Sequence, residues 1–465
     1  MRFQVLGHAC LLVEHRGVRL LVDPWLFGSC YWRSWWHFPE PVPPDERILA
    51  PDYIYLSHQH FDHFHYPSMR RFARDTPVLV AKFPLPGMED GLRDLGFTNI
   101  TALPHGKTRE LAGGLRVTSY QAGWIDDSAL VVEGGGTCLL DLNDAKFEEP
   151  VLRQIGRRHG PVDFLFKQFS SADAYPDRYR SDDPADLSLY TPDDMVNNFI
   201  ADADRLRPRY AVPFASGVCH LHPDVWDSNA HAVSPLTVEQ RFREHPPPGS
   251  EAVVMLPGAS WDSERGFALV STEVLERQDE ELERLRAKNA PRLEAQERQE
   301  AAKTLRFETF EAYMGAFLRS LPWGLKLIYS ARVAFQVPAG GGQEWWVLDF
   351  ARRRVERLSQ RPSDVVAVVE IEPGLLQDAM EKDIVNFVSI SKRLTVHLAP
   401  GKIVPFFIFR ELITLYEMGY FPLWRKAFSA RVVGVWWSRR KELLSYLGKA
   451  RRGGKAFVPR AEAAE

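Results

Sequence analysis

The stretch Ser57–His65, SHQHFDHFH, decides the fold because it places four ligand-type side chains within six positions. It directly follows the apolar run YIYL, which predicts a buried strand. His58 and His60 alternate, so an extended backbone places both side chains on one side of the loop. Asp62 and His63 can then turn towards a second point. Imidazole and carboxylate groups suit zinc, iron or manganese, so the spacing predicts a site for two metal ions.

The composition of the 465-residue chain is that of a globular protein with two or three domains. Hydrophobic residues make up 45% and charged residues 26%, which is ordinary for a soluble protein. The net charge of −3 gives no indication of nucleic-acid binding, and we expect none. The four cysteines are scattered, and the sequence shows neither a signal peptide nor an apolar run long enough to span a membrane. We therefore expect a cytoplasmic location.

Histidines are distributed unevenly along the chain. Thirteen of the 14 lie before residue 246, and only His397 lies beyond it. Histidine is rarely used in bulk for structure. Metal chemistry is therefore expected in the first half of the chain.

The first 272 residues alternate between predicted strands and helices, which favours an α/β fold. Short apolar segments predict an antiparallel opening, and later ones predict the strands that complete the sheets. Helices are expected at 66–75, 88–96 and 192–206. The strands are expected at 2–6, 9–14, 18–23, 53–56, 78–81, 115–124, 127–133, 137–142, 162–169, 209–214, 252–256 and 267–271.

The composition changes at residue 273. Glu, Arg, Ala and Leu at helical spacing predict a solvated helical connector over 273–306, broken into two pieces at Pro291. Beyond it, residues 307–465 are expected to form a smaller α+β domain without a ligand cluster. Its expected strands are 327–337, 344–350, 365–371 and 393–398, and its expected helices are 373–382 and 406–419.

The end of the chain is strongly basic. Pro422–Arg460 holds 11 Lys or Arg residues and one acid, Glu442, with tryptophans between them. A solvated terminus is one interpretation of this stretch. A weak contact with an anionic membrane surface or an acidic partner is the other.

Ligand-type side chains also follow two other predicted strands. At each of these places two residues could serve as the ligand. Asp141 and Asp144 stand at the end of the strand 137–142. His220 and His222 follow the last core strand, where a second metal would need its final ligand, and either could serve.

The His-x-His-x-Asp-His pattern after a strand resembles the metal-binding motif of the metallo-β-lactamase superfamily. The resemblance implies an αββα sandwich over residues 1–272. It also implies that His105, near a strand end downstream, is the third ligand of the first metal. A carboxylate at the end of the strand 137–142 would bridge the metals, and Asp144 suits this role better than Asp141, which lies inside the apolar run.

Several longer stretches resemble one branch, the cytidine monophosphate-N-acetylneuraminate hydroxylase and its relatives. They are DPW with an aromatic loop ending in WW, SHQHFDH, DSALVVE, QFSSADAYP and PFASGVCHLHP. The relatives have His-Pro at the place of His222, which favours His222 over His220. The animal hydroxylase carries a Rieske domain, which needs both a C-x-H and a C-x-x-H ligand pair. No C-x-H pair occurs here, so the set is incomplete, although Cys219 and His222 have the C-x-x-H spacing. Any oxygenation is therefore expected to take electrons from a separate, ferredoxin-type donor.

An aromatic stretch at residues 23–41 and a polar stretch after the strand 162–169 are the candidate walls of a substrate pocket. The expected substrate-binding residues are Trp35, Trp36, Gln168, Ser170 and Tyr175. The alternative is that the tryptophans pack against their own domain or against the C-terminal domain. Trp25 and Trp32 belong to the same stretch.

Taken together, these residues predict a dinuclear metalloenzyme. One metal is assigned to His58, His60 and His105, the other to Asp62, His63 and His222, and Asp144 bridges them; Asp62 and Asp144 are the catalytic carboxylates. An iron-dependent oxygenase acting on a small organic substrate is favoured by the branch resemblance. The alternative is a zinc hydrolase of an ester, amide or phosphodiester, because the same ligands accept both metals.

Overall fold

The computed structural model describes residues 1–123, 127–339, 341–423, 429–440, 442 and 444. Most of the basic stretch from Pro422 therefore lies outside the described residues, and its two interpretations stay open. Within the described part, no helix combines the length and the apolar composition that crossing a bilayer requires.

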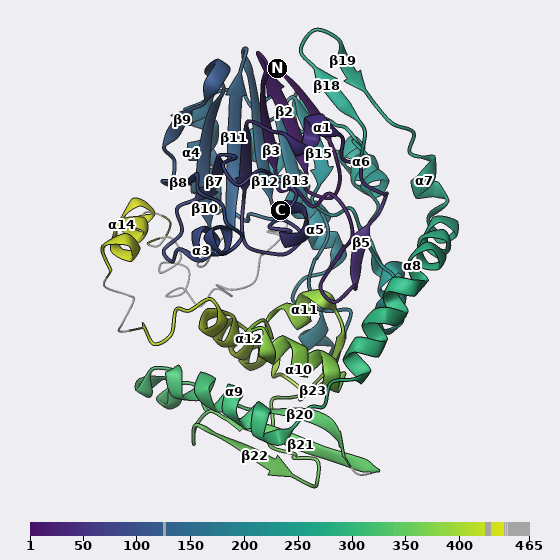
Figure 1. The fold of residues 1–465 in the computed structure, drawn as a ribbon, viewed down its shortest axis with the longest axis vertical. Helices are drawn as coiled ribbons and strands as arrows, with labels where there is room; N and C mark the ends of the chain where they lie inside the picture. The colour runs from purple at the N-terminus through teal and green to yellow at the C-terminus, as the bar shows by residue number, and fades with distance from the viewer. Residues whose placement is uncertain (124–126, 340, 424–428, 441, 443, 445–465) are drawn as a thin grey trace.

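Two mixed sheets stack in the upper part of Figure 1 and form a sandwich. In spatial order the first sheet contains β19 (Gly266–Ala268), β18 (Ser260–Asp262), β1 (Arg2–Val5), β2 (Leu11–His15), β3 (Val18–Val22), β6 (Tyr53–Leu56), β7 (Val78–Ala81) and β8 (Ile100–Leu103). The second contains β17 (Glu251–Ala252), β15 (Tyr210–Phe214), β13 (Phe164–Gln168), β12 (Thr137–Asn143), β11 (Asp127–Gly134), β10 (Arg116–Ala122) and β9 (Thr108–Glu110).

Alternation along the strands divides the side chains between an inner and an outer face. Phe3, Val13 and Val22 of the first sheet meet Val132 and Phe166 of the second in one buried core between the sheets. The outer faces are covered by helices, which confirms the predicted αββα sandwich. On the first sheet these are α1 (Glu46–Leu49), α2 (Tyr66–Met69) and α3 (Gly87–Asp94); on the second, α4 (Glu149–His159), α5 (Pro192–Leu206) and α6 (Pro235–Glu244).

The site lies where parallel strands end. β3, β6 and β7 run parallel in the first sheet, and β12, β13 and β15 run parallel in the second. Their carboxyl ends carry Asp23, the loop after β6, Asp144, and the loop that follows Gln168. Because the ends of parallel strands share one edge of a sheet, these residues are brought together there.

The predicted break of the connector at Pro291 is wrong. After the short α7 (Glu273–Glu276), α8 (Gln278–Ala301) continues through Pro291 for 24 residues. A buried stripe along α8, formed by Leu282, Leu285 and Leu293, packs against the rest of the protein, so packing outweighs the loss of one backbone hydrogen bond. The sequence suggested a helix exposed to solvent on all sides, whereas one side of α8 is buried.

A third sheet lies below the sandwich in Figure 1, beside α9 (Phe307–Ser320), α10 (Pro373–Glu381) and α12 (Ile403–Glu417). Its strands are β14 (Tyr179–Arg180), β24 (Leu394–Leu398), β23 (Ala367–Ile371), β20 (Arg332–Ala339), β21 (Gly342–Asp349) and β22 (Arg354–Leu358). Its edge strand β14 comes from the first half of the chain. The domain boundaries at 272 and 306 stay a prediction.

The remaining elements are short or were not expected from the sequence. They are β4 (Ser29–Cys30), β5 (Trp35–His37) and β16 (Val218–His220) in a small sheet, α11 (Phe387–Ser391), α14 (Ala430–Ser438), and 3-10 turns at Ala112–Gly114, Pro184–Leu187, Pro223–His231 and Trp323–Leu327. The helix expected at 66–75 ends at Met69, and the strand expected at 252–256 is confined to β17.

Candidate metal centre and the adjacent pocket

The loop after β6 brings ligand-type side chains into two groups. A tight turn closes the loop, with His63 N and Phe64 N both donating to the carbonyl oxygen of His60. Within each group the possible ligand atoms lie within 4.8 Å of one another. The first group is His58, His60 and Asp144, and the second is His8, Asp62 and His63.

Asp144 stands between the two groups. Its Oδ2 lies 3.9 Å from His58 Nε2 in the first group and 3.6 Å from His63 Nε2 in the second. One carboxylate within reach of both groups is the arrangement that a pair of metal ions requires. The structure places Asp144 in this position, whereas Asp141 belongs to neither group.

The buried carboxylate of Asp23 orients the ring of His63. Asp23 Oδ2 accepts from His63 Nδ1 at 2.9 Å, from Ser57 Oγ at 2.6 Å and from Asn143 Nδ2 at 2.5 Å. Because Nδ1 of His63 is held by Asp23, its Nε2 faces Asp62 and Asp144. Carboxylates that hold ligand imidazoles in this way are common around metal sites.

Ser57 fixes the ring of His58 by the same logic. The Ser57 hydroxyl donates to Asp23, so its oxygen accepts from His58 Nδ1 at 2.9 Å. The Nε2 lone pair of His58 is then directed towards His60, whose Nδ1 is 2.9 Å away. Two ring nitrogens 2.9 Å apart are close enough to bind the same metal ion.

Charges in the second group are strongly coupled. Burial disfavours the charge of Asp62, but His63 and His8 outweigh this effect and hold the pKa of the carboxyl well below its usual range. Burial likewise disfavours the charge of His63, but Asp62 and Asp144 outweigh it and raise the pKa of the imidazole well above its usual value. Tyr31 adds a hydrogen bond of 2.5 Å from its hydroxyl to Asp62 Oδ1. The group therefore stabilises the charged forms of both the Asp62 carboxylate and the His63 imidazole.

The residues present fit a pair of metal ions. His63 Nε2 and Asp144 Oδ1 are buried and have no hydrogen-bond partner among the described residues. Buried polar atoms usually find a partner, and a metal ion would supply one here. The donors are all imidazole or carboxylate, which suits iron and zinc alike. The four cysteines are buried and belong to neither group, although Cys30 Sγ donates to the Phe61 carbonyl in the loop after β6 at 3.2 Å.

His8 and Asp23 were missed at the sequence level. His8 Nε2 lies 3.0 Å from Asp62 Oδ2, and the side chain is 5% exposed. In the sequence, Gly7-His8 only marks a break between two strands, and Asp23 only precedes a proline. The available signal was position: a ligand-type residue directly after a predicted strand.

The structure brings neither His105 nor His222 into a group, so their assignment stays a prediction. His105 Nδ1 accepts from Gln121 N at 3.1 Å, and burial, with Arg439 second, lowers the pKa of its imidazole to about 4. His222 Nδ1 accepts from Asp224 N, while its Nε2 is buried without a partner among the described residues. His220 is also outside both groups, and its Nδ1 lies 3.5 Å from Ser34 Oγ.

The aromatic stretch contacts both the metal groups and the C-terminal part of the chain. Trp35 Nε1 donates to the Ile390 carbonyl at 2.8 Å, and Trp32 Nε1 donates to Asp378 at 2.6 Å. The rings of Trp25 and Trp35 also lie against the ring of His8. These contacts are what the packing alternative predicts.

Trp36 packs elsewhere. Its Nε1 donates to Arg33 O within the same loop, and its ring joins a cluster with Leu282 and Leu285 of α8. A substrate-binding role for Trp35 and Trp36 remains a prediction.

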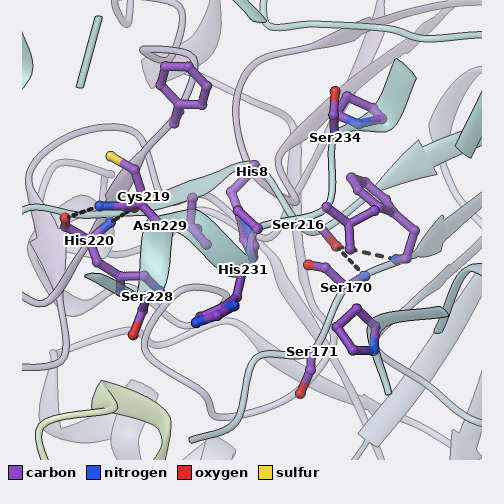
Figure 2. Close-up of a pocket in the computed structure, with 18 of the residues that line it drawn as sticks. His8, Ser170, Ser171, Ser216, Cys219, His220, Ser228, Asn229, His231 and Ser234 are labelled. Carbon is purple, nitrogen blue, oxygen red and sulfur yellow. Dashed lines mark hydrogen bonds between the residues drawn. The ribbon is translucent and has the colours of Figure 1, made fainter. Parts of the chain in front are cut away.

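A cavity of about 550 Å³ opens beside His8. Figure 2 shows His8 in the middle of its lining, with Ser170 and Ser216 on one side and Ser228 and His231 on another. This volume lies within the usual range for small-molecule sites, roughly 300–1,000 Å³. Of the two metal groups, only His8 is among the described residues of the lining, so a molecule in the cavity would reach the second group through His8.

Of the residues expected to contact substrate, Ser170 and Tyr175 line this cavity. The Tyr175 hydroxyl donates to Asp186 O and accepts from Leu189 N, so only its ring is available to a ligand. Gln168, Trp35 and Trp36 are not among the described residues of the lining.

Comparison with known proteins gives a family match for the first third of the chain. Residues 2–145 match a family model described as "Beta-lactamase superfamily domain". A protein of Mycolicibacterium smegmatis named as a putative Rieske 2Fe-2S iron-sulfur protein is 30% identical over 287 residues, which are 56% of this chain and 53% of that protein. The mouse cytidine monophosphate-N-acetylneuraminic acid hydroxylase is 28% identical over 232 residues, 47% of this chain and 39% of the hydroxylase.

This chain therefore spans about half the length of the curated relatives that it matches. Among solved structures, a metallo hydrolase from Ignicoccus hospitalis covers 56% of this chain and 98% of its own, at 18% identity and a TM-score of 0.40. The CmlA beta-hydroxylase covers 56% of this chain and 53% of its own, at 19% identity and a TM-score of 0.39. The family model covers the part of the sandwich from β1 to β12, and the likeness of this chain to the beta-lactamase superfamily rests on those residues.

Proposed function

We propose that the protein is a dinuclear metalloenzyme and that it acts as an iron-dependent oxygenase on a small organic substrate. The observation that carries the proposal is the position of Asp144, which lies within 4 Å of an imidazole from each ligand group, at 3.9 Å from His58 and 3.6 Å from His63. When bound there, two irons would supply the activation of O2. The electrons would come from a separate protein, for which a ferredoxin-type donor is our proposal.

The protein's own residues orient the ligands and hold the substrate. Asp23 and Ser57 direct the ring nitrogens of His63 and His58, and Tyr31 fixes Asp62 through its hydroxyl. The cavity beside His8 would hold the substrate, and its apolar wall would exclude water from the reacting atoms.

The relatives support oxygenation over hydrolysis. Enzymes named as hydroxylases are 27–28% identical to this chain over about half of its length. The ligand chemistry itself does not separate the two reactions, because imidazole and carboxylate bind zinc as well as iron. A zinc hydrolase is therefore the second candidate. The four free, buried cysteines support our further proposal of a cytoplasmic location.

Elemental analysis of the full chain, purified without added metal, tests the proposal. We expect about two irons per chain, and iron-loaded protein should take up O2 only when a reduced ferredoxin and substrate are supplied. The variant His58→Ala/His60→Ala should lose metal, whereas His245→Ala, at an exposed position, should keep it. Two zincs per chain together with ester or phosphodiester cleavage would establish the hydrolase instead. Absence of any bound metal would refute both.

A further inference from the structure

The cavity beside His8 has one wall that is largely apolar. Phe38, Met255, Leu256, Leu275 and Leu282 line it, and four of these five side chains are buried. They come from the β5 end, the segment after β17, α7 and α8. Such a wall favours a ligand with a hydrocarbon or aromatic body.

Lys392 brings a buried cation to the same cavity. It lines the cavity, and its side chain is only 10% exposed. Its ion-pair partner, Asp177 Oδ2, lies 3.6 Å from Nζ, which is longer than a normal N–H···O hydrogen bond. A buried ammonium group held this loosely can still donate to a ligand.

The charges at this wall do not balance. Arg178 binds both carboxylate oxygens of Asp227, and Arg410 pairs with Asp173. This leaves Lys392 and Arg180 opposite Asp177. In the part of the chain that the structure describes, the Arg180 guanidinium donates only to the carbonyl oxygens of Asp177 and Tyr179 and forms no ion pair. The lining itself holds three carboxylates, of Asp173, Asp177 and Asp227, and two cations. With Arg178 and Arg410, which lie outside the lining, counted as partners of Asp227 and Asp173, the two cations Lys392 and Arg180 face the one remaining carboxylate of Asp177.

Ser216 offers a donor next to His8. Its Oγ accepts from the backbone N–H groups of Phe169 and Ser170, at 3.3 and 3.2 Å, as the dashed lines in Figure 2 show. A hydroxyl that accepts two hydrogen bonds has its own proton left to donate. The preceding residue, Ala215, donates its backbone N–H to the carbonyl oxygen of His8 at 3.1 Å, which joins this segment to the one that carries His8. A ligand oxygen at Ser216 would therefore lie near the backbone of His8.

Neighbouring contacts fix Lys392 in place. The next residue, Arg393, pairs with both Glu300 and Asp224, and the preceding Ser391 accepts at its carbonyl from Ser34 Oγ at 2.5 Å. Lys392 itself has a φ of 59°, in the left-handed region. The backbone of Lys392 is thus held in position before a ligand arrives, which reduces the entropy lost on binding.

We propose that this cavity binds an organic anion with an apolar body, a carboxylate or a phosphate ester, whose charged group is held by Lys392 and Arg180. That this molecule is the substrate rests on the proposed function, whereas its binding does not. The apolar wall selects the body, the cations select the charge, and Ser216 donates to an oxygen near His8.

Calorimetric titration of the full chain, with its metal content measured beforehand, tests the proposal. The probes are octanoate, octyl phosphate and the neutral octanol, which share one chain and differ in charge. We expect both anions to bind and octanol to bind at least about tenfold more weakly, since a hydrogen bond to a charged group is worth about 1.5–3 kcal/mol. The tighter of the two anions identifies the charged group of the ligand.

Variants separate the contributions of charge and shape. Lys392→Met should weaken octanoate binding about tenfold or more, and Lys402→Met, at an exposed lysine, should not. Leu282→Trp should weaken binding by filling the apolar wall. Arg180→Gln, at an exposed position, tests the charge even if Lys392→Met does not fold.

Octanol binding as tightly as octanoate would overturn the anion site. So would unchanged octanoate affinity in folded Lys392→Met and Arg180→Gln proteins. The proposed function fails separately: a chain that binds octanoate but loads neither iron nor zinc keeps the anion site and loses the metalloenzyme.

Discussion

Two buried polar clusters in this protein differ in how completely their charges are paired. Around Arg393, which is 1% exposed, the guanidinium binds Glu300 through two nitrogens and Asp224 through two contacts. In the cluster around Asp62, by contrast, His63 Nε2 and Asp144 Oδ1 are buried with no hydrogen-bond partner among the described residues. The first cluster is complete without a ligand, and the second is not.

This difference separates a cluster that joins parts of the protein from a cluster that is suited to bind metal ions. Both clusters remove charges from water, which costs free energy unless the charges are compensated. The Arg393 cluster is compensated within the chain and joins α8, the segment after β16 and the C-terminal sheet. In the Asp62 cluster, His63 Nε2 and Asp144 Oδ1 face each other's group without a hydrogen-bond partner among the described residues, as ligand atoms of a metal site would. Incomplete pairing, rather than burial of charge, is the feature that points to function.

Asp62→Ala is expected to have the largest effect, because it removes a ligand from the incomplete cluster. Asp62 Oδ2 lies 3.0 Å from His8 Nε2 and 3.3 Å from His63 Nε2, so the variant leaves that group with two imidazoles. Metal content measured by elemental analysis should fall from about two ions per chain to about one, with loss of turnover. Asp52→Ala, an exposed control, should change neither. Equal loss of both metals would contradict the assignment of Asp62 to one group.

Arg393→Met breaks the complete cluster and should act on stability instead. It leaves Glu300, whose side chain is 5% exposed, without its partner, which typically costs about 3–5 kcal/mol. Urea unfolding measures this loss, and metal content of the folded fraction should stay unchanged. The exposed pair Arg284–Glu40 provides the control, since Arg284→Met should cost at most about 1 kcal/mol. Metal loss from folded Arg393→Met protein would show that the clusters are not separate.

Asp23→Asn should have an intermediate effect on the metal cluster alone. The substitution keeps the shape of the side chain but weakens the acceptor that orients His63 Nδ1. Metal affinity, measured by competition with a chelator, should fall about 10–100-fold. Asp52→Asn is the matched control. An unchanged affinity would mean that the ring of His63 needs no orienting carboxylate.

Trp35→Phe should have the smallest effect, and it tests which cluster the aromatic stretch serves. It removes the hydrogen bond from Nε1 to Ile390 O and should cost about 0.5–1.5 kcal/mol in unfolding free energy. Trp36→Phe, which loses a bond within its own loop, is the control. If Trp35 only packs the two parts together, turnover per folded molecule will not change. A fall in turnover with little change in stability would restore the pocket-wall interpretation.

The central strands of the sandwich were predictable from sequence, because each is a short apolar run between turn residues. The short strands β4, β5, β9, β14, β16 and β18, and β22 of the third sheet, were not expected. β6 and β7 match the expected ranges, and β12 extends one residue beyond its expected end. The spacing of His58, His60, Asp62 and His63 in the loop after β6 also predicted that these side chains would form candidate metal-binding groups. These features depend on neighbours in the chain, which a sequence shows directly.

What could not be predicted depends on contacts between distant segments. His8 joins Asp62 only because β1 and β2 lie in the same sheet as β6, and its position after a predicted strand does not by itself identify this partner. Pro291 leaves α8 unbroken because packing of the buried leucines holds the helix on both sides of it. The site assignments of His105 and His222 came from resemblance rather than from spacing, and they remain to be tested.

The pairing of β14 with β24 has a consequence for how the protein folds during its synthesis. Tyr179 pairs with Val396, so the ribosome must add more than 200 further residues before this edge of the sheet can close. Closing so long a loop is slow, and the entropy it costs grows with the logarithm of its length. Until then the side chain of Tyr179, which is buried in the folded protein, is exposed on the nascent chain. Chaperone dependence should therefore be decided there rather than at the metal loop.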